Sequence, residues 1–260
     1  MCVSRVAFTI AGVEIYWYGI IMCASILVAI WVATMLCKVK KYDTDMPINI
    51  ALVVVPVGIL SARLFSVLFE NGLDLSDYLN FRTGGMSIIG AVIGGAFALI
   101  VYLLIKRPKD KWVYFDVLAV VLLLSQAIGR WGNFFNGEVY GRLIESSSPF
   151  ARFPYAVEID GNFYQALFLY ESVLNLIGFL FLSLIFLCSK KKGLPTAAYL
   201  IYYGSVRTFL EMFRQEEYIL RFGSIAVSRL FSATMIAFGI VLFVTILIRS
   251  RKHEGKHEKK

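Results

Sequence analysis

Apolar stretches long enough to cross a bilayer constrain this chain more than any other feature of its sequence. A helix of about 20 residues covers the roughly 30 Å hydrocarbon core of a membrane, and about seven windows of this kind are present. They lie near residues 16–36, 47–69, 85–105, 112–129, 165–188, 195–214 and 228–248. The sequence therefore predicts an all-α polytopic membrane protein with about seven transmembrane helices, in which residues 1–260 form a single integral-membrane domain.

Composition excludes an ordinary soluble domain. Hydrophobic residues make up 58% of the chain and charged residues 17%, and the mean hydropathy is +0.71. The first apolar stretch begins only after Glu14 and has neither a basic leader nor a small-residue cleavage site. We interpret it as a retained span instead of a signal peptide.

Basic residues concentrate in alternate connections, which indicates the orientation in the membrane. The connections are those at 38–41, 106–111 and 190–192, and the tail at 249–260. The positive-inside rule places these segments in the cytoplasm, so we expect an outward N-terminus and an inward C-terminus. The outward connections are then those near 70–84, 130–164 and 215–227. This asymmetry and contact with anionic lipid explain the net charge of +8, and no nucleic-acid partner is expected.

Neither the cysteines nor the histidines indicate a metal site. Cys2, Cys23, Cys37 and Cys188 show no paired spacing, and His253 and His257 belong to a lysine-rich tail. We predict no metal and no cofactor.

Polar residues crowd the outer end of the fourth apolar stretch, in the sequence GRWGNFFNGE. Arg130, Asn133, Asn136 and Glu138 supply a planar cationic fork, two amides and a carboxylate at headgroup depth. Two interpretations remain open for this segment. One is an interfacial turn with Trp131 in the aromatic belt, and the other is a binding site for a lipid phosphate.

Charged residues also occur inside the apolar stretches, where they usually mark a lined cavity. Arg207 and Glu211 lie four residues apart and share one helix face, so they either neutralise each other or form part of a site. Glu171 is compatible with a buried structural partner. We place Arg63 and Asp116 outside the site, the first as a paired or snorkelling side chain and the second at the cytoplasmic boundary.

Small residues at Gly90 and Gly94 follow a small-xxx-small pattern, which favours close packing of two helices. The alternative is that the glycine-rich segment from Gly84 presents backbone amides to a phosphate at a helix N-terminus.

Several ordered motifs together resemble the prolipoprotein diacylglyceryl transferase family of bacterial membrane enzymes. They are YWYG at 16–19, SARLF at 61–65, GGMSIIGAVIGG at 84–95, GRWGNFFNGEVYGR at 129–142, FLYES at 168–172 and GSVRTFLEMFR at 204–214. The resemblance implies a multi-pass enzyme of the bacterial cytoplasmic membrane. Such an enzyme transfers diacylglyceryl from phosphatidylglycerol to the lipobox cysteine of a prolipoprotein, leaving a thioether and releasing glycerol phosphate.

The resemblance also implies roles for individual residues. The catalytic candidates are Tyr18, Arg130, Arg207 and Glu211, and the substrate-binding candidates are Asn133, Glu138, Gly141 and Arg214. We add Asn136 to the substrate-binding candidates because of its amide side chain in the same segment. The chain departs from the family pattern at Ile89, where many members carry histidine or tyrosine. It also lacks the histidine that usually precedes the YES element.

The chemistry that we expect follows from these residues. Arg130 and Arg207 hold the lipid phosphate and stabilise the charge that grows on it in the transition state. Glu211 is our first candidate for the base that takes the thiol proton, with Glu138 and Tyr18 as alternatives. Two rival functions are a lipid-binding paralogue without catalysis, which Ile89 favours, and a transporter or channel. The absence of an evident internal repeat disfavours the transporter.

Overall fold

The computed structural model describes residues 4–69, 78–79, 85–215, 221–222 and 225–257 of the chain. Within these residues it contains seven helices. They are α1 (Trp17–Val39), α2 (Met46–Phe69), α3 (Ile88–Lys106), α4 (Lys111–Asn136), α5 (Leu167–Cys188), α6 (Leu194–Glu211) and α7 (Val227–His257). Each helix covers most of one predicted apolar stretch, so the all-α prediction is confirmed.

Six of the seven helices are long and apolar enough to cross a membrane, namely all except α6. The prediction of a seventh span near 195–214 is therefore only partly met: the helix exists, but its sequence is more polar. Tyrosines face its interior side, and Arg207 and Glu211 occupy its last two turns. α6 packs against α5 and α7.

The described part of the chain divides into two compact units. One comprises residues 1–36 and 115–260, and the other comprises residues 37–114. The larger unit contains most of α1 and α4, all of α5, α6 and α7, and every β-strand. The smaller unit is built on α2 and α3.

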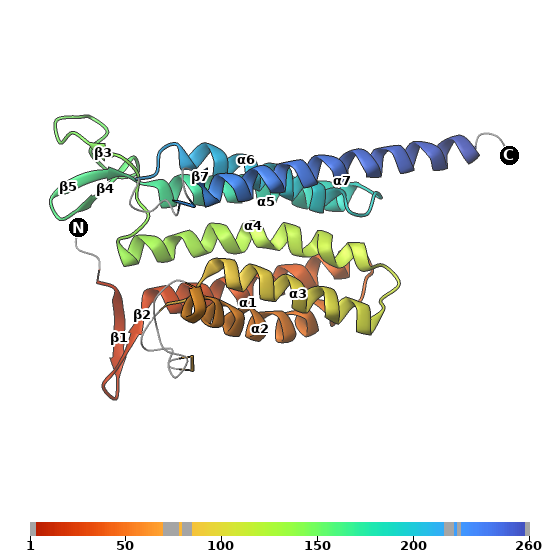
Figure 1. The fold of residues 1–260 in the computed structure, drawn as a ribbon, viewed down its shortest axis with the longest axis horizontal. Helices are drawn as coiled ribbons and strands as arrows, with labels where there is room; N and C mark the ends of the chain where they lie inside the picture. The colour runs from red at the N-terminus through yellow and green to blue at the C-terminus, as the bar shows by residue number, and fades with distance from the viewer. Residues whose placement is uncertain (1–3, 70–77, 80–84, 216–220, 223–224, 258–260) are drawn as a thin grey trace. The chain divides into compact units, whose positions relative to one another are not determined.

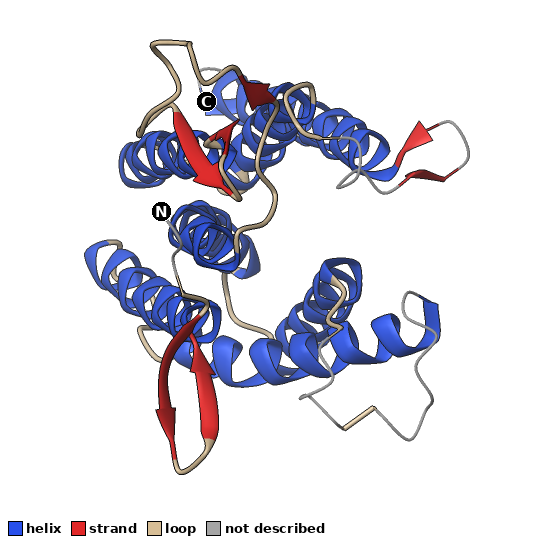
Figure 2. Cartoon of the chain, turned by 90° about the vertical axis from the view of Figure 1, so that its left-hand side faces the viewer, coloured by secondary structure: helices blue, strands red, loops and turns tan. Residues whose placement is uncertain are grey.

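The strands of the larger unit are short and form three small antiparallel sheets. β1 (Val6–Ile10) pairs with β2 (Val13–Tyr16), β3 (Leu143–Ile144) and β4 (Ala156–Ile159) flank β5 (Asn162–Gln165), and β6 (Arg221–Phe222) pairs with β7 (Ile225–Ala226). Strands β1 to β5 lie at one end of this unit, and the C-terminal end of α7 lies at the other (Figure 1). Figure 2 looks along the helices from the strand end and shows the β1–β2 hairpin projecting sideways from α1.

A buried carboxylate joins α4 to α6 at the end opposite the strands. Asp116 is 2% exposed and accepts hydrogen bonds from Gly193 N at 2.7 Å, Thr196 N at 3.0 Å and Thr196 Oγ1 at 2.6 Å. These are the unpaired amides at the N-terminus of α6, where a negative charge is favourable. Asp116 is thus a helix cap, which agrees with its place outside the predicted site.

The two helices of the smaller unit touch through their small residues. A Cβ added at Gly94 would lie 2.0 Å from Ser61 Oγ, and one added at Gly90 would lie 2.5 Å from Ser61 O. Nothing larger than hydrogen fits, so the packing role predicted for this pattern is confirmed. Gly84 lies outside the described residues.

Arg63 of α2 is completely buried in the smaller unit. It donates from Nη1 to Gly85 O at 2.9 Å and from Nε to Tyr78 O at 3.4 Å. The guanidinium is therefore hydrogen-bonded to backbone carbonyls of the connection that follows α2. The prediction that Arg63 is paired is confirmed, and the snorkelling alternative is wrong because the side chain has no exposure.

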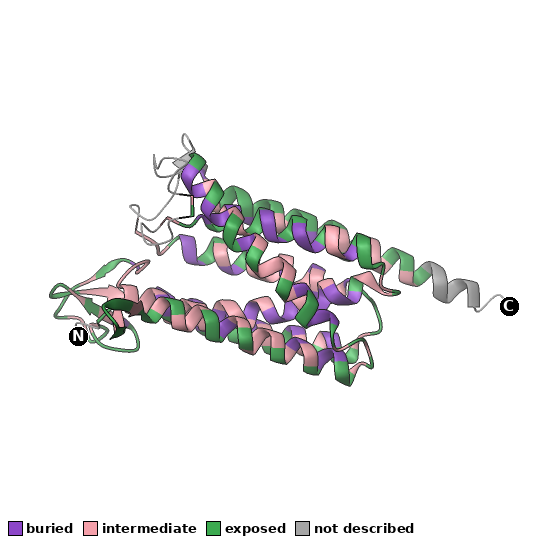
Figure 3. Cartoon of the chain, turned by 90° about the horizontal axis from the view of Figure 1, so that it is seen from below, coloured by how far each residue is buried: buried purple, intermediate pink, exposed green. Residues whose placement is uncertain are grey.

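Long apolar side chains cover much of the helix surfaces. Leu27, Leu52, Phe97, Leu184 and Val241 are each more than half exposed, and exposed positions recur along the helices (Figure 3). A soluble protein buries such side chains, whereas lipid solvates them.

The C-terminal end of α4 differs from the sequence prediction. The apolar stretch ends at residue 129, but the helix continues for two further turns to Asn136. Gly132 lies inside this helix and lets Tyr18 of α1 approach, because a Cβ there would lie 2.7 Å from the Tyr18 ring. The interfacial-turn interpretation is wrong for residues 130–136.

Candidate functional site

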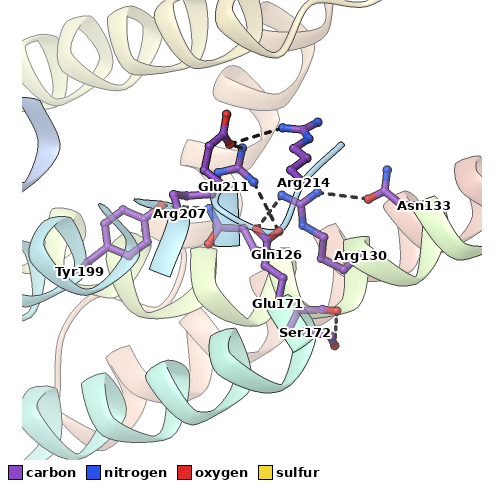
Figure 4. Close-up of polar contacts among 10 residues, drawn as sticks. Gln126, Arg130, Asn133, Glu171, Ser172, Tyr199, Arg207, Glu211 and Arg214 are labelled. Atoms are coloured by element: carbon purple, nitrogen blue, oxygen red, sulfur yellow. Dashed lines mark hydrogen bonds and ion pairs between the residues drawn. The ribbon is translucent and has the colours of Figure 1, made fainter. Parts of the chain in front are cut away.

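Five charged side chains, four of them from three helices and one from the residues just after α6, meet near the strand end of the larger unit (Figure 4). We call Arg130, Glu171, Arg207, Glu211 and Arg214 the arginine–carboxylate cluster. Arg130 comes from α4, Glu171 from α5, Arg207 and Glu211 from α6, and Arg214 from the residues just after α6. The structure thus brings together residues 84 positions apart, from Arg130 to Arg214.

Glu171 lies at the centre of the cluster. Its Oε1 is 2.6 Å from Arg130 Nη2, and its Oε2 is 3.4 Å from Arg207 Nη1. The carboxylate is only 5% exposed, whereas the two guanidinium side chains are 21% and 16% exposed. One buried anion therefore holds two partly open cations side by side. The sequence analysis treated Glu171 as a structural partner and left it out of the site.

Glu211 forms the second anionic point of the cluster. Its Oε2 lies 3.7 Å from Arg207 Nη2 and 3.9 Å from Arg214 Nη1, and its Oε1 accepts a hydrogen bond from Ser228 of α7. The side chain is 1% exposed. Arg207 and Glu211 do pair, as one of the two interpretations held. The pair is nevertheless part of the larger cluster, so the two interpretations are compatible.

Three guanidinium groups and two carboxylates leave the cluster with one net positive charge. Burial lowers the pKa of Arg214, and the nearby Arg207 charge lowers it further, while Glu211 opposes both. An additional anion would stabilise the charged form of a guanidinium in this environment. The cluster is therefore suited to bind an anion.

Little space remains inside the cluster in this conformation. A cavity of about 10 Å³ lies between Arg130, Asn133, Glu171, Arg207 and Arg214. That volume holds about one water molecule. A phosphate group requires these long side chains to move apart, which their partial exposure permits.

The signature that follows Arg130 forms a hydrogen-bonded chain. Arg130 Nη1 donates to Asn133 Oδ1 at 3.3 Å, and Glu138 Oε1 accepts from Asn133 Nδ2 and from Asn136 Nδ2, each at 3.2 Å. The helix ends immediately after Asn136 because Gly137 takes a φ of +63°, a conformation that glycine adopts without strain. Glu138 is thus turned back towards the helix end.

Tyr18 lies on the other side of this helix end. It stands in the first turn of α1, against Gly132, and lines a cavity of about 930 Å³ with Asn136 and Glu138. The rest of this lining is largely apolar and comes from the hairpin and the first three turns of α1. A cavity of this size with a few polar groups at one end suits an amphipathic ligand.

Gly141 connects the signature to Arg214 through the backbone. The two residues form an isolated antiparallel bridge, and Gly141 N also donates to Gln165 O at 2.9 Å. A Cβ at this position would lie 2.7 Å from Gln165 Cβ. Gly141 therefore has a structural reason to lack a side chain, and it positions Arg214 beside the cluster.

The structure extends the site with residues that the sequence analysis did not select. Tyr203 of α6 interacts with Arg130, and Tyr199, one turn away, accepts a hydrogen bond from Gln126 Nε2 at 3.0 Å. Their signal in the sequence is the four-residue spacing of Tyr199, Tyr203 and Arg207, which places the three side chains on one face of α6. Within the described residues no group of acidic, cysteine or histidine side chains could hold a metal ion.

Comparison with known proteins gives full-length matches. Residues 5–245 match the family model described as prolipoprotein diacylglyceryl transferase. A protein of Clostridium novyi is 36% identical over 255 residues, covering 95% of this chain and 98% of its own length. A protein of Clostridium botulinum strain Langeland is 34% identical over 257 residues, covering 96% and 100% of the two chains. Both are named phosphatidylglycerol–prolipoprotein diacylglyceryl transferase.

Proposed function

The chain belongs to the prolipoprotein diacylglyceryl transferase family of the bacterial cytoplasmic membrane, and we propose that its arginine–carboxylate cluster binds the phosphate of phosphatidylglycerol during transfer. The observation that carries this proposal is the bridge formed by Glu171 between Arg130 and Arg207. Two guanidinium groups that share one carboxylate also have the spacing needed to share one phosphate. Glu171 then acts as an internal anion that keeps them together.

Geometry explains why binding the phosphate need not break the cluster. Each guanidinium carries five N–H donors, and Glu171 uses one nitrogen of each arginine. Arg130 Nη1 also donates to Asn133, and Arg207 Nη2 faces Glu211, so the N–H groups that these contacts leave over become available to phosphate oxygens once the side chains move apart. Glu171 and Glu211 then fix the planes of the guanidinium groups before the lipid arrives, which reduces reorganisation during the reaction.

The transfer itself is a displacement at carbon. The cysteine thiol of the prolipoprotein loses its proton to a base, and its sulfur forms a bond to the glyceryl carbon next to the phosphate. The bond between that carbon and the phosphate oxygen breaks, and its electron pair leaves with glycerol phosphate. Negative charge therefore grows on the oxygen nearest the arginines, which bind the transition state more strongly than the intact lipid.

Glu138 fits the role of thiol base better than Glu211 does. Glu211 is buried and contacts Arg207, Arg214 and Ser228. Glu138 instead accepts hydrogen bonds from two neutral amide side chains, and it borders the larger cavity together with Tyr18. A carboxylate between cations is a weak base, and an enclosed one is difficult for a peptide thiol to reach. The comparison of Glu138→Gln with Glu211→Gln tests this order. Thioether formation by equal amounts of folded protein should fall further in the first variant than in the second.

The cavity beside Tyr18 is our candidate for the apolar part of a substrate. Its lining on α1 is largely apolar, and its polar lining comes from Asn136 and Glu138 together with Arg5 and Glu14 of the N-terminal segment. An acyl chain or the hydrophobic segment of a signal peptide would place its reacting end near Glu138. Larger side chains at Ala24 should raise KM for the lipid or the peptide, and a titration of each substrate in turn identifies which one occupies the cavity.

We further propose that the N-terminus faces outward and the C-terminus inward, in one integral-membrane domain. The asymmetry of basic residues supports this orientation. Ser147 and Lys190 are both exposed and belong to connections predicted to lie on opposite sides. In a background without native cysteines, an impermeant thiol reagent should label Ser147→Cys in intact cells but Lys190→Cys only after the membrane is opened. The reverse pattern would contradict the orientation.

The transfer assay separates an enzyme from a lipid-binding paralogue, the alternative that Ile89 favours. Purified protein receives phosphatidylglycerol and a lipobox peptide, and mass spectrometry measures the thioether product against an Arg130→Gln control. We expect product from the native chain, because Arg130, Arg207 and Glu211 of the family pattern meet in the cluster and Glu138 is linked to Arg130 through Asn133. Equal signals from both proteins, with both substrates shown to be accessible, would support the paralogue.

A further inference from the structure

The hairpin β1–β2 at the start of the chain is amphipathic in its register. Phe8 pairs with Ile15, and Ile10 pairs with Val13. Directly paired residues of antiparallel strands point to the same face, and every second residue does so along a strand. Phe8, Ile10, Val13 and Ile15 therefore form one face that is entirely apolar.

The opposite face of the hairpin is polar. Thr9 pairs with Glu14, and Tyr16 lies two residues beyond Glu14 on the same side. Tyr16 donates its hydroxyl hydrogen to Glu14 Oε2 at 2.8 Å. Alternation of this kind is typical of a strand pair that has an apolar environment on one side only.

No part of the described chain covers the tip of the apolar face. Phe8, Ile10 and Val13 are 49%, 61% and 47% exposed. A two-stranded hairpin without a packing partner is marginally stable in water. These side chains therefore require an apolar partner that the described residues do not supply.

The hairpin is continuous with a membrane span. Strand β2 ends at Tyr16, α1 begins at Trp17, and Trp17 N donates to Arg5 O at 3.1 Å, which closes the base of the hairpin onto the helix. Trp17 also stacks on Phe135 at the end of α4, with ring centroids 5.1 Å apart. Tyr16 and Trp17 are the residue types that concentrate at a membrane surface. The base of the hairpin thus lies where two spanning helices end.

The direction of the hairpin also fits a membrane surface. It runs across the direction of α1 in Figure 1 and projects sideways from the helix end in Figure 2. A segment that leaves a spanning helix in this way extends along the bilayer surface instead of away from it.

We propose that the β1–β2 hairpin is a membrane-surface anchor, with its apolar face resting on lipid at the surface where α1 begins. The partner is the acyl and glycerol region of that leaflet, and the polar face with Thr9 and Glu14 is directed to water. Because the hairpin is tied to Trp17, the anchor fixes the height and rotation of the first turn of α1. Tyr18 lies in that turn, so the anchor also holds one wall of the larger cavity.

Depth-dependent quenching tests the anchor in the full-length protein. Native cysteines are replaced by alanine, the background is checked for folding, and the protein is placed in nanodiscs of phosphatidylglycerol and phosphatidylcholine. Ile10→Cys and Thr9→Cys are each labelled with the fluorophore NBD. These neighbours occupy opposite faces of one strand, so the second is a matched control for the first.

We expect spin-labelled lipid to quench NBD at residue 10 several times more strongly than at residue 9, with emission at shorter wavelength. The pair Val13→Cys and Glu14→Cys repeats the comparison on the second strand and guards against a local disturbance. Equal quenching on the two faces would overturn the proposal. So would shielding of residue 10 that appears only after a lipobox peptide is added, because the apolar face would then bind the peptide.

Discussion

Two regions of this protein bury arginine, and they do so in different ways. Arg63 in the smaller unit has no exposure and directs its donors at backbone carbonyls of Tyr78 and Gly85. Arg130 and Arg207 in the larger unit remain partly exposed and share the carboxylate of Glu171. All three have the same composition signal in the sequence, a cation in or beside an apolar stretch.

The partners of an arginine indicate its role better than its depth does. Backbone carbonyls are fixed acceptors, so the hydrogen bonds from Arg63 to Tyr78 O and Gly85 O tie a connection to α2. Carboxylates on α5 and α6 instead hold Arg130 and Arg207, whose side chains stay partly exposed. The difference teaches that an arginine enclosed by the main chain is structural, whereas one held by carboxylates and still partly exposed can bind a ligand.

Substitution of the arginines should give the largest contrast. We expect Arg130→Gln or Arg207→Gln to lower kcat by about 10²- to 10³-fold or more, the usual cost of removing one donor from a developing oxyanion. Arg63→Gln should instead lower the free energy of unfolding by about 1–3 kcal/mol, because it leaves buried carbonyls without donors. Thioether formation measures the first effect and thermal unfolding in lipid measures the second.

Lysine variants sharpen the same contrast. Arg130→Lys should stay strongly impaired, because an ammonium group cannot contact Glu171, Asn133 and a phosphate with a planar fork. Full transfer by Arg130→Gln, or a loss of transfer in folded Arg63→Gln equal to that of Arg130→Gln, would contradict the distinction between the two regions.

The next largest contrast is expected between two buried carboxylates, Glu171 in the cluster and Asp116, which caps the start of α6. Glu171→Gln keeps the size of the side chain but removes the charge that holds Arg130 and Arg207 together. We expect kcat to fall by about 10²-fold, the effect of misplacing catalytic groups by about 1 Å, with a smaller change in KM for phosphatidylglycerol. Glu171 is a positioning residue, so the split between kcat and KM is the informative readout.

Asp116→Asn is the matched control for Glu171→Gln. Asp116 accepts hydrogen bonds from backbone amides and a hydroxyl at the start of α6. Removal of its charge should therefore lower the free energy of unfolding by about 1 kcal/mol and leave kcat unchanged. A kcat loss in Asp116→Asn comparable to that in Glu171→Gln would show that charge anywhere along α4 to α6 affects transfer.

Apolar length and glycine spacing made most of the fold predictable from the sequence. The predicted stretch at 47–69 corresponds to α2, which runs from Met46 to Phe69, and the pattern at Gly90 and Gly94 correctly indicated a close helix contact. Both features are local, because length and side-chain size act within one helix or between neighbours. The fourth helix was underestimated because hydropathy falls at Arg130, although its hydrogen bonds continue to Asn136.

The site was only partly predictable, for a physical reason. Arg130 and Arg207 could be selected from ordered motifs, but the role of Glu171 depends on contacts with residues 41 and 36 positions away. Nothing local distinguishes such a glutamate from a buried structural one. The ranking of Glu211 above Glu138 also rested on spacing, which does not reveal that Ser228 of α7 and Arg214 enclose Glu211.

The glycine contact in the smaller unit should give a moderate effect on stability alone. Gly94→Ala would place a Cβ 2.0 Å from Ser61 Oγ, whereas Gly58→Ala in α2 would place one 3.6 Å from Ala91 O, an ordinary contact. We expect the first change to lower the free energy of unfolding by about 1–3 kcal/mol through overpacking and the second to be nearly neutral. Thermal unfolding in lipid compares them, and equal stability of the two variants would refute the tight contact.

The smallest effect is expected at Ile89, where the chain departs from the family pattern. Ile89 is half-buried in the first turn of α3, and its neighbour Ile88 is 76% exposed. If Ile89 occupies the position of the usual histidine, Ile89→His should preserve the transfer rate or raise it. The gain should stay below the ~10²-fold lower end of general acid–base assistance, because Glu138 already takes the thiol proton in our proposal. Ile88→His is the control, since a polar group at that exposed position should leave the rate unchanged.

Single-turnover transfer by equal amounts of folded protein measures both variants. A lower rate per folded molecule in Ile89→His alone would show that the position does not serve the reaction. A loss of folding would show that Ile89 is a packing residue and that its match to the histidine position is coincidental.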